Sequence, residues 1–182
     1  MGNIVANVGA ISGDQLRQDV INQRLPLAFF STSTAVTPLA WVTENKKLLE
    51  DGLAKYGAVL LRGYKKYDVQ ELEDFIEKTS GDLLAYRNRS TPRSLISGKI
   101  YTSTEYPADQ IIHQHNESCY THEWPTRLFF CCITAATRGG ETPISDSRKV
   151  LKRIPKEIVD RFERAGITYL RTFTPGLGLT WQ

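Results

Sequence analysis

The sequence predicts an α+β protein that is rich in strand, with a β-sheet core and helices packed outside it. Capped stretches with helical apolar spacing alternate with short apolar runs, and the second half holds more strand-like runs than helix. The chain has 182 residues, of which 41% are hydrophobic and 24% charged. We therefore expect one globular domain over residues 1–182, with about 1–35 as a weakly defined lead-in.

In the first half of the chain, the sequence predicts two long helices on either side of a buried strand. Residues 16–24 have the composition of a short helix. A helix is predicted over 37–57, because it opens on a capping threonine followed by proline and closes on glycine. The apolar run at 58–64 predicts a strand. A capping box opens a second helix, predicted over 68–81.

The second half is expected to contain shorter elements. Loops and short strands are predicted over residues 82–110, because this stretch is rich in Ser, Thr, Tyr, Arg and Pro. Helix is predicted over 145–166 in two pieces that are separated at Pro155. Three further strands are predicted at residues 110–117, 126–136 and 167–174.

Composition excludes several classes of partner. The net charge of +3 is too slight to indicate a nucleic-acid partner, which would need a clustered basic face, and no apolar run is long enough for a membrane helix. The N-terminus shows no secretory signal. Three cysteines with an adjacent pair, Cys119, Cys131 and Cys132, make a poor disulfide framework, so a cytoplasmic location is expected. Cys131 and Cys132 are interpreted as buried small residues.

The stretch HQHNESCY, residues 113–120, is the strongest candidate for chemistry. On a strand, His113, His115 and Glu117 share one face, while Gln114 and Asn116 point to the other. Imidazole and carboxylate two positions apart can converge on one metal ion, which makes His-x-Glu a workable half-site. A distant histidine would complete the facial triad of non-haem Fe(II) oxygenases.

Three alternatives to this half-site stay open. His113 and His122 can be ordinary hydrogen-bonded or surface histidines. A cupin-type site would instead use His113 together with His115, although no glutamate follows at the expected place. A structural zinc site would need cysteine ligands, and adjacent Cys131 and Cys132 alternate faces on a strand, which disfavours it.

A second informative stretch is TRGGETPISDSRKVL, residues 137–151. Gly139-Gly140 permits a tight turn with positive φ, and the residue before Pro143 is driven to extended backbone. Asp146 can cap the following helix. The hydroxyl of Thr142 could hydrogen-bond a carboxylate.

In order and spacing, YTSTEYP, HNESCY, EWPTRLFFCC and RGGETPISDSRKV resemble the TauD/TfdA superfamily of Fe(II)/2-oxoglutarate-dependent dioxygenases, closest to its SyrP-like or clavaminate-synthase-like branch. The resemblance covers roughly residues 56–182. It implies a double-stranded β-helix, or jelly roll, with flanking helices. It also implies His115 and Glu117 as iron ligands and Thr142 as a contact of 2-oxoglutarate.

The implied reaction uses iron, 2-oxoglutarate and O₂ to oxidise, by hydroxylation, a C–H bond of a small organic substrate. No catalytic residue beyond the metal ligands is assigned. Tyr101, Thr104 and Tyr106 precede the metal segment and are candidates to line a substrate pocket, with ordinary strand and loop roles as the alternative.

The family's distal histidine and its 2-oxoglutarate-binding arginine lie further downstream than this sequence reaches. After Glu117 the sequence holds one histidine, His122, and Arg171 is not at the position of that arginine. An N-terminal portion of such an enzyme is therefore expected, with an incomplete sheet that favours self-association. The alternative is a truncated, non-catalytic member that acts as a binding or interaction protein.

Overall fold

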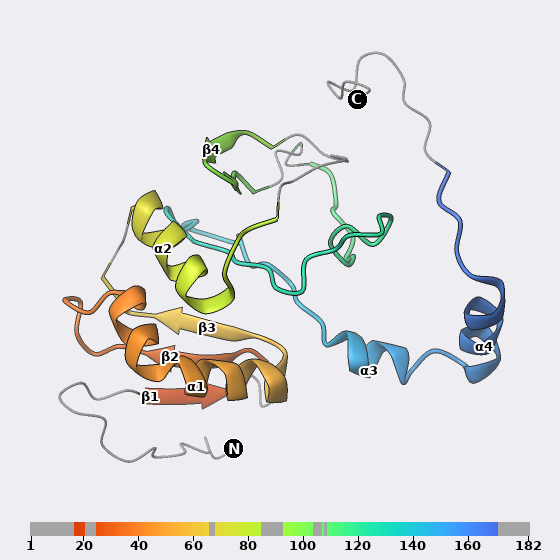
Figure 1. Cartoon of the computed structure of the whole chain (residues 1–182), viewed down its shortest axis with the longest axis horizontal. Coiled ribbons are helices and arrows are strands. Elements are labelled where there is room, and N and C mark those ends of the chain that lie inside the picture. Colours follow the sequence, from red (N-terminus) through yellow and green to blue (C-terminus); the bar gives the residue numbers. More distant parts are fainter. Residues whose placement is uncertain are drawn as a thin grey trace. The chain divides into compact units, whose positions relative to one another are not determined.

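The computed structural model describes residues 17–20, 25–65, 68–84, 93–103, 107 and 109–170 (Figure 1). For residues 17–20, only the backbone is described. The chain divides into two compact units. The first comprises Met1–Leu83 with Phe129–Ala135, and the second comprises Leu84–Leu128 with Ala136–Gln182.

A three-stranded sheet organises the first unit. Its strands are β1 (Arg17–Val20), β2 (Leu27–Phe30) and β3 (Val59–Arg62), in the order β1-β2-β3. The β1–β2 pair is antiparallel and the β2–β3 pair is parallel. Because parallel neighbours need a crossover, the chain passes through helix α1 between β2 and β3.

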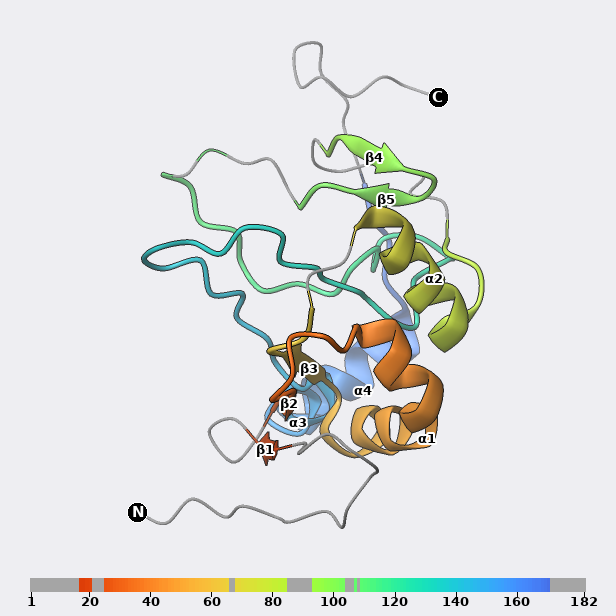
Figure 2. The same ribbon diagram turned by 90° about the vertical axis from the view of Figure 1, so that its left-hand side faces the viewer.

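Helix α1 (Pro38–Tyr56) begins and ends where the sequence predicts. The Thr37 hydroxyl accepts a hydrogen bond from the Ala40 amide at 3.1 Å. Gly57 adopts φ 78°, and its amide donates to the Leu53 carbonyl at 2.8 Å. Figure 2 places α1 on one face of the sheet.

Helix α2 (Val69–Ser80) confirms the predicted capping box. The Asp68 carboxylate accepts from the Glu71 amide at 2.9 Å, and the Glu71 carboxylate accepts from the Asp68 amide at 3.2 Å. The Gly81 amide then donates to the Glu77 carbonyl, which closes the helix.

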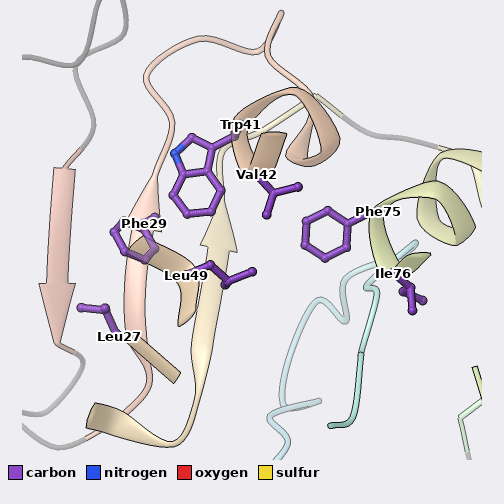
Figure 3. Packing of buried hydrophobic residues seen from close by; sticks show 7 residues of the cluster. All are labelled: Leu27, Phe29, Trp41, Val42, Leu49, Phe75 and Ile76. Carbon is purple, nitrogen blue, oxygen red and sulfur yellow. The ribbon is translucent and has the colours of Figure 1, made fainter. Parts of the chain in front are cut away.

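The core of the first unit lies between the sheet and the two helices (Figure 3). Trp41 packs against Phe29 with a ring-centroid distance of 4.9 Å. Phe75 of α2 meets the edge of Phe129 at 6.2 Å. The buried apolar residues are Leu27, Ala28, Phe29, Trp41, Val42, Leu49, Phe75 and Ile76. Residues 27–30, which fall in the expected lead-in, thus belong to a deeply buried strand.

The second unit contains shorter elements. Strands β4 (Leu95–Ser97) and β5 (Ile100–Tyr101) form an antiparallel pair. Helices α3 (Ser147–Leu151) and α4 (Lys156–Ala165) lie on either side of Pro155, as predicted. The Asp146 carboxylate caps α3 by accepting from the Arg148 amide at 3.0 Å.

Several predicted elements are wrong. Part of 16–24, expected to be helical, is strand β1, because the edge of β2 provides a pairing partner for an otherwise weak helix. The predicted strands at 110–117 and 126–136 form no strand. Of the strand predicted at 167–174, residues 167–170 form none and residues 171–174 lie outside the described residues. These runs have strand-like composition, but in the described part of the chain they gain no ladder partner.

The observed fold class agrees with the prediction in part. Helices and strands are mixed, as expected, but within the described ranges helical residues outnumber strand residues. The same ranges contain no closed barrel, so the jelly roll stays a prediction. The single-domain organisation is likewise a prediction. No helix in the described part is long and apolar enough to cross a bilayer.

Candidate metal centre

The candidate metal residues lie on an irregular segment that runs into a turn. Residues 111–116 have no regular secondary structure, and 117–120 form the turn. Ser118 adopts φ 55°, and its carbonyl accepts from both the amide and the hydroxyl of Thr121. Glu117 is therefore held at the start of a hydrogen-bonded turn, whereas His115 lies on the exposed segment before it.

The ring of His115 is oriented by its own backbone. Nδ1 lies 2.7 Å from the carbonyl oxygen of His113. A carbonyl can only accept, so Nδ1 carries the proton in this contact. In the neutral ring Nε2 then keeps its lone pair, which is the arrangement found in many metal-binding histidines.

Glu117 forms an ion pair within the second unit. The guanidinium Nη2 of Arg93 lies 3.3 Å from Oε2 of Glu117. The two side chains are 22% and 17% exposed. The pair joins Arg93, two residues before β4, to the start of the turn, and sequence reasoning missed it because the partners are 24 positions apart.

The residues between the candidate ligands contact a different segment. The Ser145 hydroxyl donates to Oε1 of Gln114 at 2.7 Å, and the Ser147 hydroxyl donates to Oδ1 of Asn116 at 3.2 Å. Two successive contacts with the same sequence offset align 114–116 with 145–147. This alignment anchors the segment that carries His115.

Thr142 lies three residues before that anchored segment. It is exposed and follows the predicted glycine turn, in which Gly139 and Gly140 have φ of 69° and 81°. A Cβ on Gly140 would lie 2.7 Å from the Cβ of Ala136, so the turn requires glycine there. The role of Thr142 toward 2-oxoglutarate stays a prediction.

The three substrate candidates are placed in part. Tyr101 is half-buried at the end of β5. Thr104 and Tyr106 lie outside the described residues. The lining of a substrate pocket by these side chains therefore stays a prediction.

The donor chemistry of His115 and Glu117 fits two positions of a non-haem iron site, one imidazole nitrogen and one carboxylate oxygen. In the described ranges, no group of three or more His, Cys, Asp or Glu side chains gathers to hold a metal. His113 and His122 are exposed. The expectation that Cys131 and Cys132 are buried is wrong. Cys131 is half-buried and Cys132 is exposed, and both lie on a segment that forms no strand.

Two further polar contacts in the second unit shift the pKa values of side chains. The Arg148 side chain donates to Asp146 and lowers the pKa of that carboxyl below its ordinary value. The same contact raises the pKa of Arg148. A hydrogen bond with Cys119 raises the pKa of Tyr169.

Comparison with known proteins gives a consistent match. The family model described as "Taurine catabolism dioxygenase TauD, TfdA family" matches residues 23–180. The chain is 39% identical over 134 residues to the dapdiamide synthesis protein DdaC of Enterobacter agglomerans. It is 35% identical over 133 residues to a clavaminate synthase-like protein of Arabidopsis thaliana.

These alignments cover most of this chain but less than half of each relative. They include 74% and 71% of the chain, against 41% and 40% of the two relatives. The chain thus spans about two fifths of the length of the curated relatives that it matches.

Proposed function

The chain belongs to the TauD/TfdA family, and from this premise we propose that it carries the first two ligands of a non-haem iron site. The function proposed is that of an Fe(II)/2-oxoglutarate-dependent dioxygenase that oxidises a C–H bond of a small organic substrate. The observation that carries the proposal is the His115 hydrogen bond to the His113 carbonyl. It leaves Nε2 as a metal donor, two residues before a carboxylate.

Each candidate ligand has a distinct task in this proposal. His115 offers a neutral nitrogen whose ring orientation is held by the backbone. Glu117 offers a charged oxygen at the start of the 117–120 turn and neutralises part of the metal's charge. Iron, when bound with 2-oxoglutarate and O₂, supplies the oxidising power for the C–H bond.

Thr142 is assigned to the co-substrate. Its hydroxyl can donate a hydrogen bond to a carboxylate of 2-oxoglutarate, and such charge-assisted bonds are stronger than neutral ones. The contacts of Ser145 and Ser147 with 114–116 tie its segment to the one that carries His115. Tyr101 is assigned to the substrate, because an aromatic ring suits an organic molecule.

Metal binding tests the proposal directly. Manganese(II) is the probe, because it prefers nitrogen and oxygen donors over the free cysteines. We expect His115→Ala and Glu117→Gln each to weaken binding by at least about tenfold, since even loss of a ligand's hydrogen-bond partner typically costs that much.

His113→Ala is the matched control, because it keeps the backbone carbonyl that orients His115. Binding close to wild type in this variant, with loss in the other two, supports the pair His115 and Glu117. Equal losses in His113→Ala and His115→Ala would instead favour the cupin-type alternative, and unaltered binding in all three variants would reject the metal site.

A second function is proposed beside the first, that of a non-catalytic family member that acts through binding or interaction. Fe(II)-dependent succinate formation from 2-oxoglutarate separates the two functions. Turnover that is lost in Glu117→Gln supports the enzyme, whereas manganese binding without turnover supports the non-catalytic protein.

A further inference from the structure

The Arg93–Glu117 ion pair places a permanent positive charge on a proposed metal ligand. Nη2 of Arg93 lies 3.3 Å from Oε2 of Glu117, and both side chains are largely withdrawn from solvent. A guanidinium stays protonated and has no lone pair to offer a metal. Arg93 can therefore influence this site but cannot be one of its ligands.

A divalent metal and Arg93 would make opposing demands on the same carboxylate. Both are cations, and at short range in a partly desolvated site they repel each other. Of the two carboxylate oxygens, Oε2 makes the contact with Arg93, so a metal that binds Oε2 replaces that contact. The Arg93–Glu117 contact can be exchanged, because its Nη2–Oε2 distance of 3.3 Å is longer than the roughly 2.7–2.9 Å of a strong charge-assisted hydrogen bond.

We propose that Arg93 is a positioning residue that competes with the metal for Glu117. Without metal it compensates the carboxylate and keeps it in place, and metal binding replaces its contact. The inference rests on the proposed function, because it takes Glu117 as a ligand. The opposite possibility is that Arg93 orients the carboxylate for the metal, and the two possibilities predict changes of opposite sign.

Neutral substitutions at position 93 show whether Arg93 lowers or raises the affinity for metal. With metal removed by chelation and manganese(II) then titrated, we expect Arg93→Met to bind about threefold to fivefold more tightly than wild type, as the loss of a modest competing ion pair predicts. Arg153→Met is the matched control, because it removes an equal charge from an exposed arginine of the same unit. Its affinity should stay near that of wild type.

Unchanged or weaker binding in Arg93→Met would overturn the inference, as would equal tightening in Arg153→Met. The Glu117→Gln variant distinguishes failure of the proposed function from failure of the competition between Arg93 and the metal. If that variant binds manganese as wild type does, the proposed function fails. If it loses binding while Arg93→Met does not tighten it, the competition fails and the ligand assignment stands.

Thermal unfolding gives a readout that does not depend on metal. We expect Arg93→Met to lower the Tm of the chelated protein and Glu117→Gln, added to it, to restore part of the loss, because removing both partners avoids an uncompensated carboxylate. Arg93→Gln replaces Arg93→Met in the titration if the latter does not fold. Should neither neutral variant fold, the absence of rescue by Glu117→Gln would overturn the inference.

Discussion

At the scale of single residues, the candidate metal centre depends on a backbone atom. The carbonyl of His113 orients the His115 ring, so the His113 side chain contributes nothing to that contact. Glu117 is held differently, by the turn that follows it and by Arg93. The two proposed ligands therefore respond to different substitutions, which allows their contributions to be measured separately.

Thr142→Val tests the proposed co-substrate contact. The change keeps the shape of the side chain and removes its hydroxyl, so we expect 2-oxoglutarate affinity to fall by at least about tenfold, because a hydrogen bond to a charged group typically contributes about 1.5–3 kcal/mol. Isothermal titration of 2-oxoglutarate in the presence of manganese(II) measures the effect. Thr137→Val, on the other side of the glycine turn, is the control, and equal 2-oxoglutarate affinity in all three proteins would remove the assignment.

Asp146 gives a prediction for pH. Its pKa is below the ordinary value, chiefly because the Arg148 side chain donates to it. A depressed pKa means that the cap stabilises α3 above the pKa of the unfolded chain and is lost as pH falls through the folded pKa. The NMR shift of the Arg148 amide should follow this titration, with its midpoint below the ordinary aspartate range.

Arg148→Ala should move that midpoint upward, because the first cause of the low pKa is removed. The cap itself stays possible in this variant, since the Asp146 carboxylate accepts from the backbone amide at position 148. A midpoint that does not change would show that the side-chain contact has no effect on the carboxyl.

At the scale of elements, local capping accounts for where the helices begin and end. The capping box of α2 satisfies the amides of Asp68 and Glu71 reciprocally. Its buried apolar residues, Phe75 and Ile76, belong to the core of the first unit. Cap and core contacts thus stabilise the same helix by independent means.

Asp68→Ala should lower the free energy of unfolding by about 1 kcal/mol, the usual cost of losing an N-cap side chain. Urea denaturation followed by circular dichroism measures it. Glu77→Ala removes an exposed carboxylate from the same helix outside the capping box, and it should cost less than about 0.5 kcal/mol. Equal losses in the two variants would mean that general charge, rather than capping, is responsible.

At the scale of the whole molecule, the two units differ in burial. The buried apolar residues of the described ranges all come from the first unit. Helix α4 of the second unit has no buried residue, and Ile158 and Phe162 on it are 43% and 54% exposed. Exposed apolar surface of this kind favours association.

We therefore expect the chain to self-associate as its concentration rises, which sedimentation velocity measures. Phe162→Glu should shift the distribution toward monomer, because it places a charge within the apolar face of α4. Arg161→Gln, a polar change beside it, should leave the distribution near that of wild type. A single monomeric species over a wide concentration range would contradict the prediction.

Local signals in the sequence determined the helices and turns. The caps at Thr37, Asp68 and Asp146 bind amides within three residues, and Pro155 separates α3 from α4 through its own geometry. The glycine turn before Thr142 is local as well. The pair His115 and Glu117 was proposed from spacing and family resemblance, and its role as a metal site stays a proposal.

The local sequence predicted β3, but tertiary structure decided the pairing of the strands, the fate of two ambiguous runs and the surroundings of Glu117. Residues 17–20 became a strand because β2 pairs with them, whereas 110–117 did not become one despite a strand-like composition. Arg93 reached Glu117 across 24 residues of sequence. Caps close hydrogen bonds between near neighbours, so they can be foreseen from a few letters. Strand pairs and ion pairs join distant segments, and their partners are chosen when the chain folds.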